Sequence, residues 1–278
     1  MDEKEKLRLE DIARKMRLVV LGIIYRAHAS HIGSAYSVMD LLVYLYEKIL
    51  RINPLEPFAP DRDRFILSKG WGVSALYSVL NHKKIIDDTF LPSYCKDGSP
   101  YIGIATRNGT PGMEATTGSM GHGLPVGVGI ALAGKLKKEK YRVIVVIGDG
   151  ELDEGSTWEA ILQASHFKLD NLTVIVDANG WQSYGRTKDV LNLGSISDKF
   201  SSFGWSTKNI NGHDFSEIED AFHTLPFSEN KPSVVIAKTI KGKGVSVFED
   251  RNEWHYQTPR EKEMTIAMEE LGGKVDLV

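Results

Sequence analysis

Two apolar runs of strand length lie in the middle of the chain, and each ends abruptly in a polar turn that contains glycine. Residues 143–147 run into Gly148-Asp149-Gly150, and residues 173–176 run into Asp177-Ala178-Asn179-Gly180. The stretch between them, residues 156–169, has the pattern of a helix. Runs that are apolar on both faces are typical of parallel strands covered by helices. We therefore predict a strand–helix–strand unit in an α/β fold, with a mostly parallel sheet and helices on both faces.

Apolar side chains elsewhere predict the remaining elements. They recur at three- and four-residue steps over residues 7–29, which predicts a long helix. A second helix is expected after Ser37, whose spacing to Asp40 resembles a capping box with aspartate in the acidic place. The other expectations are a short strand within residues 61–70, helices over 73–80 and 126–136, a helix and loop over 83–108, a helix capped by Asp214 or Ser216 and ended by Pro226, a last buried strand over 233–239, and a closing helix with a frayed end over 260–278.

Composition narrows the class of protein and its location. With 278 residues, 42% of them hydrophobic, the chain can bury the core of one α/β domain or a closely joined pair, and we expect a single domain over 1–278. The net charge of −3 and the lack of a basic block argue against nucleic acid as a partner. No apolar run reaches membrane length, residues 2–6 are unlike a signal peptide, and Cys95 is the only cysteine. We expect a cytoplasmic protein with no disulfide and no membrane contact.

The two polar turns carry oxygen ligands. The carboxyl ends of parallel strands meet at one edge of the sheet, where open α/β folds bind their ligands. Asp149 offers a carboxylate and Asn179 an amide oxygen, and the neighbouring glycines let a ligand approach the backbone. Hard oxygen ligands at neighbouring strand ends suit Mg²⁺, which keeps few protein ligands and takes the rest from phosphate and water. The alternative is a pair of ordinary turns in which these side chains only cap the backbone.

These turns resemble a known signature. Gly148-Asp149-Gly150 followed by Asn179 is similar to the motif of enzymes that use thiamine diphosphate, and residues 148–160 resemble the transketolases in particular. The resemblance implies a thiamine diphosphate-binding fold. It also implies that Asp149, Asn179 and the backbone carbonyl of Trp181 bind the metal that holds the diphosphate, which is Mg²⁺ or, in its place, Ca²⁺ or Mn²⁺. The rival dinucleotide motif Gly-x-Gly-x-x-Gly fails, because it requires glycine at Asp153.

A second motif resembles the cofactor turn of the same family. Residues 116–123, Thr-Thr-Gly-Ser-Met-Gly-His-Gly, are similar to the transketolase sequence Thr-Thr-Gly-Pro-Leu-Gly-Gln-Gly. Backbone amides in a glycine turn at a helix start attract anions such as a diphosphate, although a plain packing role is the alternative. His122 replaces the family's glutamine, and a surface cap and a site contact are both open for it. From the two motifs, the resemblance implies the cofactor-binding residues Gly118, Ser119, Met120, Gly148, Gly150 and Glu151.

Two histidines match substrate-facing positions of the family. His31 lies in a turn that resembles the transketolase sequence Ser-Gly-His-Pro-Gly, with Ile32 in place of proline. His255, in Trp254-His255-Tyr256, falls where transketolases place a histidine late in this domain. The resemblance implies that both hydrogen-bond to, or exchange protons with, sugar hydroxyls, and that His255 also borders the cofactor. Without the resemblance, each is read as a solvated or capping histidine.

Three other segments qualify the match. Residues 61–70 are similar to a segment that ends in Ser-x-Gly-His-Gly, but Trp71 replaces the histidine that lies beside the diphosphate and the substrate. An indole donates one hydrogen bond and cannot shuttle a proton, so Trp71 is kept as a cofactor-binding candidate only. Residues 107–114 lack the family's His-Pro pair before Thr-Pro-Gly, and both departures point to a less common substrate. Residues 238–244 resemble the family's Lys-Thr-x-x-Gly-x-Gly and are interpreted as a solvated turn, because no Walker spacing is present.

The resemblance covers residues 7–270 but only the diphosphate-binding half of a transketolase. In this class the cofactor's aminopyrimidine removes the first proton with the help of a glutamate from a pyrimidine-binding domain, which this chain lacks. We therefore expect one subunit of a split transketolase, transferring a two-carbon ketol unit between a ketose and an aldose, as phosphates or modified sugars. The expected partner is a C-terminal transketolase subunit with that glutamate, in an α₂β₂ assembly. The alternatives are a related thiamine diphosphate enzyme with a specialised sugar or acyl donor, and a non-catalytic subunit that retains the fold.

Overall fold

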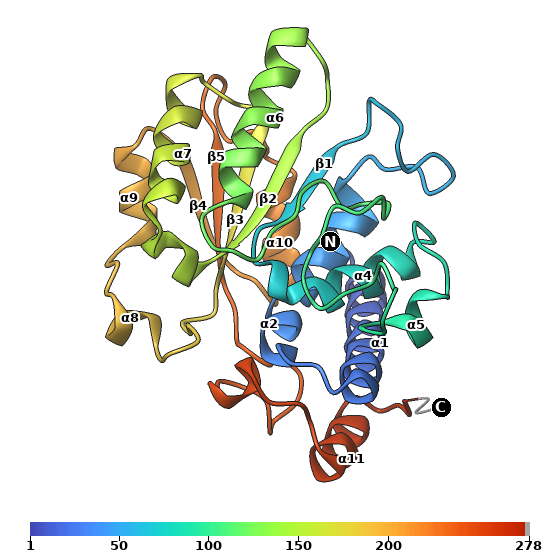
Figure 1. Cartoon of the computed structure of the whole chain (residues 1–278). Helices are drawn as coiled ribbons and strands as arrows, with labels where there is room; N and C mark the ends of the chain where they lie inside the picture. The colour runs from blue at the N-terminus through green and yellow to red at the C-terminus, as the bar shows by residue number, and fades with distance from the viewer. Residues whose placement is uncertain (276–278) are drawn as a thin grey trace.

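A central parallel sheet organises the computed structural model, which describes residues 1–275. Its strands are β1 (Arg64–Leu67), β2 (Val143–Gly148), β3 (Leu172–Ala178), β4 (Ser206–Asn211) and β5 (Ser233–Lys238). All neighbours pair in parallel, in the order β1-β2-β3-β5-β4 (Figure 1). The two apolar runs of the sequence, β2 and β3, are adjacent, and Gly148 pairs with Asp177 near their carboxyl ends. The polar turns that follow these strands therefore lie next to each other.

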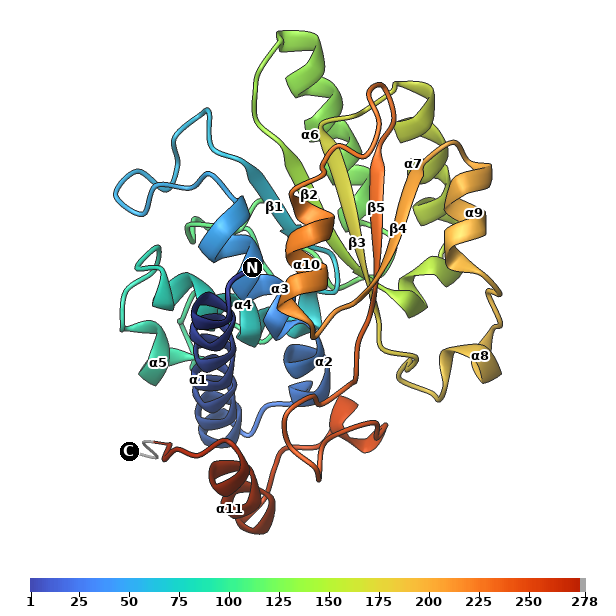
Figure 2. The ribbon, with the colours of Figure 1, turned by 180° about the vertical axis from the view of Figure 1, so that it is seen from behind.

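Helices cover both faces of this sheet, as the apolar runs predict (Figures 1 and 2). One side carries α6 (Gly123–Lys137), α7 (Gly155–His166) and α9 (Ile196–Ser202), and the other carries α1 (Glu3–Ala27), α3 (Met39–Tyr44), α4 (Val73–His82) and α10 (Phe215–Phe222). Successive residues of β2 point to opposite faces, so Val145 packs in the core with α6 whereas Ile144 packs in the core with α1. The α/β prediction is confirmed.

The other helical elements are short. They are α2 (Ile32–Ser37), a π-helical turn (Leu45–Ile49), α5 (Phe90–Ser93), α8 (Thr187–Val190), α11 (Glu261–Glu270) and 3-10 turns at Gly70–Gly72, Asp149–Asp153 and Glu253–His255. The helix expected within residues 83–108 is reduced to α5, and the end predicted to fray at 276–278 lies outside the described residues. Asp214 caps α10, as predicted, by accepting a hydrogen bond of 2.8 Å from the Ser216 amide. None of the helices over residues 1–275 has the length and hydropathy of a membrane-spanning segment.

The capping box predicted at Ser37 was wrong. Ser37 ends α2 rather than starting a helix, and its hydroxyl donates to the Asp177 carboxylate at 2.6 Å. Asp40 lies in α3 and accepts hydrogen bonds of 2.7 and 2.9 Å from the Arg17 guanidinium. Both side chains are buried, where polar groups must be hydrogen-bonded, and their partners come from distant segments. Long-range pairing thus takes the place of the local cap.

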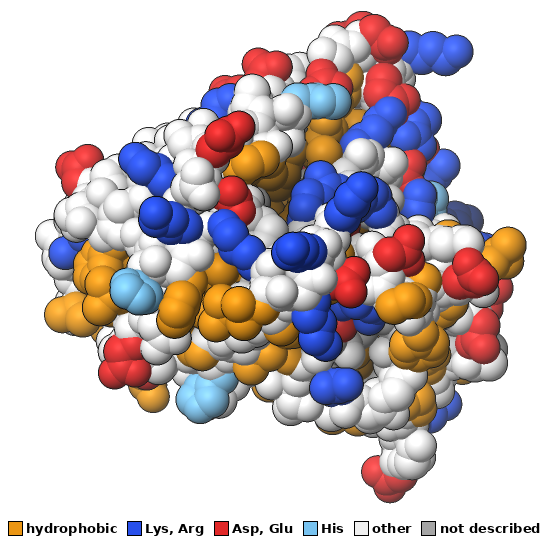
Figure 3. Space-filling model, turned by 90° about the horizontal axis from the view of Figure 1, so that it is seen from above, with side chains coloured by type: hydrophobic (Ala, Val, Ile, Leu, Met, Phe, Trp, Pro, Cys, Tyr) orange, Lys and Arg blue, Asp and Glu red, His pale blue; other side chains and the backbone are white. Residues whose placement is uncertain are grey.

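The two edges of the sheet differ in their chemistry. At the amino edge, fully buried Asp63 accepts hydrogen bonds from Arg51 at 2.8 Å and from Arg142 at 2.6 Å. Figure 3 views this end and shows Lys and Arg side chains interspersed with acidic ones. At the carboxyl edge, the loops that follow β1, β2, β3 and β5 converge beside α2 (Figure 1). The fold therefore brings the predicted site segments to one end of the molecule.

Candidate active site

A pocket of about 300 Å³ opens at the carboxyl edge of the sheet. Ser119 is exposed and is the one predicted site residue that does not line this pocket. His122 also lies outside it, exposed, with Nδ1 2.9 Å from the Met120 carbonyl oxygen, which favours the surface role. The predicted residues that do line the pocket are His31, Trp71, Gly118, Met120, Gly148, Asp149, Gly150, Glu151, Asn179, Trp181 and His255.

Asp149 and Asn179 face the pocket from the ends of β2 and β3. Asp149 is 4% exposed, and one carboxylate oxygen accepts hydrogen bonds of 2.9 Å from the Gly180 amide and the Thr187 hydroxyl. The side-chain oxygen of Asn179 accepts from the Trp181 amide at 3.0 Å. Burial raises the pKa of Asp149 to about 6, and no Lys or Arg of the described chain forms an ion pair with it. A buried carboxylate without a cation is costly, so this donor set fits a bound metal ion.

His31 and His255 lie side by side on the pocket wall. Their ring centroids are 5.0 Å apart, and the His31 amide donates to the His255 carbonyl at 3.2 Å. Burial, followed by the charge of Lys241, lowers the pKa of His31 to about 4 and that of His255 to about 3. The Nδ1 atoms already contact Ser30 and Lys241, whereas neither Nε2 has a hydrogen-bond partner within residues 1–275. Both rings are therefore neutral near pH 7 and keep Nε2 available for a ligand.

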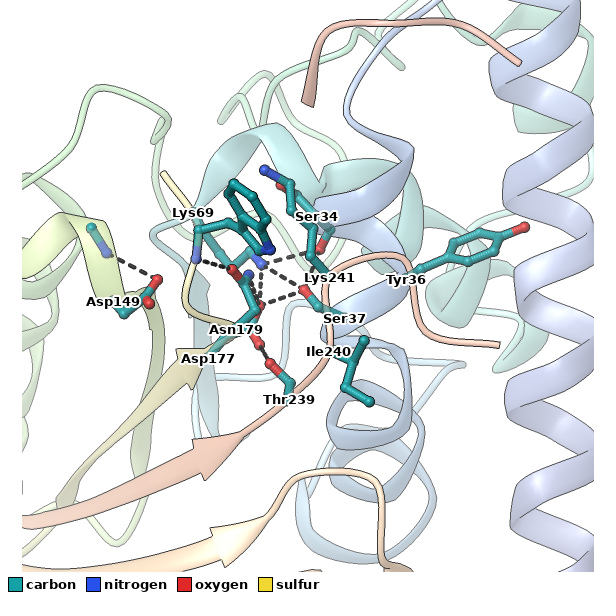
Figure 4. A network of polar contacts seen from close by, with 12 residues as sticks. Ser34, Tyr36, Ser37, Lys69, Asp149, Asp177, Asn179, Thr239, Ile240 and Lys241 are labelled. Atoms are coloured by element: carbon teal, nitrogen blue, oxygen red, sulfur yellow. Dashed lines mark hydrogen bonds and ion pairs between the residues drawn. The ribbon is translucent and has the colours of Figure 1, made fainter. Parts of the chain in front are cut away.

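A buried polar network, which sequence reasoning missed, centres on Asp177 (Figure 4). The Asp177 carboxylate forms an ion pair with Lys69 and accepts hydrogen bonds from Ser37 and Thr239. Burial opposes the charged carboxylate, but the Lys69 ammonium and the hydroxyl donors hold its pKa below the ordinary value. Lys69 also donates to the Ser34 carbonyl at 3.0 Å, so the network joins α2 to the ends of β1, β3 and β5. A carboxylate inside an apolar strand is costly unless it is paired. Asp177, at the end of the apolar run of β3, was therefore the sequence signal that could have revealed this network.

Lys241 corrects the interpretation of residues 238–244 as a solvated turn. Its side chain is 1% exposed, and its Nζ lies 3.3 Å from the Asn252 side-chain oxygen and 3.2 Å from Nδ1 of His255. Gly33 leaves room for the Lys241 side chain, because a Cβ at position 33 would lie only 3.0 Å from Cγ of Lys241. Burial and the neighbouring Lys69 lower the pKa of Lys241 to about 8. No carboxylate of the described residues pairs with Lys241, and although it does not itself line the pocket, its charge would favour an anionic ligand there.

Glu151 connects the two glycine motifs. It is fully buried, and one carboxylate oxygen accepts hydrogen bonds from the Ser68 hydroxyl and, at 3.1 Å, from the Gly121 amide. The Ser68 hydroxyl oxygen in turn accepts from the Gly123 amide at 3.1 Å. Burial raises the pKa of Glu151 to about 7, and its other oxygen, also buried, has no partner within residues 1–275. The turn over residues 117–123 is thereby held against the ends of β1 and β2.

Four exposed apolar side chains surround the mouth of the pocket, and we call them the apolar rim. Tyr184 is 87% exposed and Tyr256 60%, and Ile104 and Met120 are 39% and 38% exposed. They come from four separate segments of the chain. Of these, only Met120 is among the predicted cofactor-binding residues. A cluster of exposed apolar residues marks an interaction site in many proteins.

Comparison with known proteins agrees with this geometry. Residues 9–276 match the family model described as "Transketolase, thiamine diphosphate binding domain". The chain is 39% identical over 272 residues to an apulose-4-phosphate transketolase subunit of Phocaeicola vulgatus, covering 98% of this chain and 96% of that protein. It is 34% identical over 268 residues to a 6-deoxy-6-sulfo-D-fructose transketolase subunit of a Clostridium species, covering 96% of this chain and 98% of that protein.

Solved transketolases share the fold. The transketolase of Campylobacter jejuni superposes with a TM-score of 0.91 at 28% identity, over 99% of this chain and 44% of that one. That of Leishmania mexicana superposes with a TM-score of 0.89 at 25% identity, over 96% of this chain and 41% of that one. This chain thus spans less than half the length of these enzymes. Together these similarities show that the chain belongs to the thiamine diphosphate-binding domain family of the transketolases, which are transferases.

Proposed function

We propose that this chain is the thiamine diphosphate- and Mg²⁺-binding subunit of a split transketolase that transfers a two-carbon ketol unit between a ketose and an aldose. The observation that carries the proposal is the buried Asp149 carboxylate, which has no basic partner within residues 1–275 and lies near Asn179 at the ends of two neighbouring strands. A carboxylate in that state favours a divalent cation, and Mg²⁺ commonly bridges protein oxygens and phosphate.

The residues around the pocket support a metal-bound diphosphate. Asp149, the Asn179 side-chain oxygen and the Trp181 carbonyl would hold the ion, whose role is to position the diphosphate and balance its charge. Lys241 supplies a buried positive charge that no carboxylate of the described residues pairs with, and the backbone of residues 117–123 forms a glycine turn ahead of α6. When bound, thiamine diphosphate supplies the electron sink that breaking a ketose carbon–carbon bond requires.

The chain's own side chains would orient the sugar. His31 and His255 are neutral near pH 7 because their pKa values are lowered to about 4 and about 3. Each lines the pocket and has an Nε2 without a hydrogen-bond partner among the described residues, which suits hydrogen bonding to sugar hydroxyl or carbonyl oxygens. A neutral imidazole donates a hydrogen bond from one ring nitrogen and accepts one at the other, so this role needs no charged form of the ring.

The partner would bind over the pocket mouth. Relatives of nearly the same length are named as subunits of transketolases, and the solved transketolases are more than twice as long as the part that this chain matches. The apolar rim leaves Tyr184 and Tyr256 largely exposed at that mouth. We therefore place a second subunit, with the pyrimidine-binding domain and its glutamate, against the rim, and expect two copies of each chain in the complex.

The test is reconstitution with the co-purified partner chain. Asp149→Ala is expected to weaken thiamine diphosphate binding in the presence of Mg²⁺ by about 100-fold, roughly 2.7 kcal/mol, and to abolish ketol transfer. Isothermal titration calorimetry measures the first effect and a coupled sugar-phosphate assay the second. Asp97→Ala, at an exposed loop aspartate, is the matched control and should change neither. Retained cofactor affinity in Asp149→Ala would refute the metal site, and a wild-type complex that binds no cofactor would favour a non-catalytic subunit.

A further inference from the structure

Trp71 differs from the other tryptophans in what its indole N–H does. The chain has five tryptophans. Four of them donate the indole N–H to a protein oxygen, namely Trp158 to Leu152 at 2.7 Å, Trp181 to Asp250 at 2.8 Å, Trp205 to Ile161 at 2.9 Å and Trp254 to Val247 at 2.7 Å. Within residues 1–275, the N–H of Trp71 has no such partner, although the side chain is half-buried and lines the pocket. Trp71 therefore brings to the pocket wall an indole N–H that no protein oxygen of the described residues uses.

The ring of Trp71 is held at a defined place on the pocket wall. It projects from the 3-10 turn Gly70–Gly72 that follows β1. Its Cζ2 atom lies 3.8 Å from the position that a Cβ on Gly148 would take. Its ring centroid is 6.5 Å from that of His255. The indole thus lies between the end of β2 and the histidine pair.

The neighbouring groups identify the kind of atom that this wall recognises. Lys241 is an ammonium donor, so the contact between its Nζ and Nδ1 of His255 places the imidazole proton on Nε2. His255 and Trp71 therefore both present N–H donors, which call for an acceptor oxygen. Lys69 is the only Lys or Arg among the described residues that line the pocket, and it is paired with Asp177. Lys241 is buried, contacts His255 through Nδ1 and does not itself line the pocket. This wall thus presents N–H donors and no free cation, which suits the neutral hydroxyl or carbonyl oxygens of a sugar rather than its phosphate.

We propose that Trp71 is a specificity-determining residue, which donates its indole N–H to a hydroxyl or carbonyl oxygen of the sugar substrate beside His255. The inference rests on the proposed function and names the part of the sugar that this chain reads. An indole donates a hydrogen bond but transfers no proton, so it selects a sugar by the presence of an acceptor oxygen at this point. A site built to bond a substrate hydroxyl rejects the analogue that lacks it, because the donor is left unpaired once the bound sugar shuts it off from water.

The decisive variant is Trp71→Phe, which keeps an aromatic ring and removes the N–H. In the reconstituted complex, kcat/KM is measured for an intact sugar phosphate and for analogues that each lack one hydroxyl group. We expect the variant to lower kcat/KM about 10-fold for the intact sugar and to leave it unchanged for the one analogue that lacks the accepting oxygen. Trp158→Phe, which removes an indole N–H bonded within the protein, is the matched control and should keep the wild-type discrimination.

Two further measurements distinguish a contact of the indole N–H with the sugar from a contact with the cofactor. Calorimetry with Mg²⁺ and thiamine diphosphate should give the same Kd for Trp71→Phe and for the wild-type complex, which also shows that the variant is folded. Trp71→His, which retains a ring N–H, should keep more of the discrimination than Trp71→Phe. A loss of cofactor affinity with unchanged sugar discrimination would assign the N–H to the diphosphate and overturn the proposal. Failure of the wild-type complex to bind cofactor would instead contradict the proposed function itself.

Discussion

At the residue scale, two buried lysines lie close to the pocket, and their surroundings differ. Lys69 is 1% exposed and forms an ion pair with Asp177, which also accepts two hydroxyl donors. Lys241 is equally buried, but its Nζ hydrogen-bonds only to Asn252 and His255 among the described residues, and neither carries a negative charge. Burying a charge without a partner costs stability. Lys241 thus weakens the ligand-free fold at a place where an anionic ligand would benefit from it.

This leads to a prediction for Lys241→Met. The variant should raise the free energy of unfolding of the ligand-free chain at pH 7 by about 1–3 kcal/mol, because it removes the unpaired buried charge. It should also weaken thiamine diphosphate binding. The folded-state pKa of Lys241, about 8, lies below the ordinary 10.5, so the destabilisation of the fold by this buried charge is fully present below pH 8. This destabilisation decreases as pH rises from 8 to 10.5, because Lys241 loses its proton in the folded state before it does so in the unfolded state.

Urea denaturation at pH 7 and pH 10 measures this effect. The stability gap between Lys241→Met and the wild type should shrink at the higher pH. Lys238→Met, at the exposed last residue of β5, is the matched control and should show neither the gain nor the pH dependence. A Lys241→Met chain that is less stable than the wild type at pH 7 would contradict the idea of an uncompensated charge.

At the scale of elements, the end of β1 packs directly against the glycine turn ahead of α6. A Cβ on Gly70 would lie 2.5 Å from the Thr117 carbonyl oxygen and 2.6 Å from its carbon, both backbone atoms that cannot swing aside. The Gly70 carbonyl also accepts a hydrogen bond of 3.1 Å from the Ala105 amide. Glycine at this position is therefore required by close backbone approach, and the approach sets the shape of the turn over residues 117–123.

Gly70→Ala is accordingly predicted to destabilise the chain by about 1–3 kcal/mol, because the added methyl overpacks the contact. Cofactor affinity should fall as well, since the turn moves away from β1. The control is Gly155→Ala at the start of α7, where a Cβ would meet nothing within 4 Å and is expected to be neutral or to stabilise by about 0.5–1 kcal/mol. Thermal denaturation measures the stability of both variants. A melting temperature of Gly70→Ala equal to that of Gly155→Ala would count against the packing argument.

At the scale of the whole molecule, the apolar rim and the partner proposal are linked. The rim includes Tyr184, which is 87% exposed at the pocket mouth, whereas Leu55 is 91% exposed in the loop before β1. The two side chains are alike in exposure and differ in position. They therefore allow a test of whether the mouth of the pocket, rather than any exposed apolar residue, binds the second subunit.

We predict that Tyr184→Asp weakens binding of the partner chain at least about 10-fold, roughly 1.4 kcal/mol, because a charge is placed in an apolar contact. Leu55→Asp should leave the affinity unchanged. Sedimentation velocity or surface plasmon resonance with the purified partner gives the dissociation constants. Equal affinities for the two variants would show that the partner binds elsewhere.

The sequence alone predicted the fold class and the segments that form the candidate site. The runs at β2 and β3 identified a parallel sheet because strand periodicity and glycine turns are local properties. Asp149 and Asn179 could be identified as candidate ligands because each follows directly on its strand. The predicted lining residues, Ser119 excepted, do meet in one pocket. Transketolase membership was likewise readable from contiguous motifs, and the family match over residues 9–276 confirms it.

Only the tertiary structure decided which distant polar groups are buried together. Lys69 and Asp177 are 108 residues apart and Ser37 and Asp177 are 140 apart, so no local pattern could pair them. The same reason explains the wrong capping box at Ser37 and the wrong solvated turn at Lys241, because burial depends on which segments pack above a residue. Local order along the chain therefore determined the strands and the candidate ligands at their ends, whereas the packing of remote segments determined the charges around them.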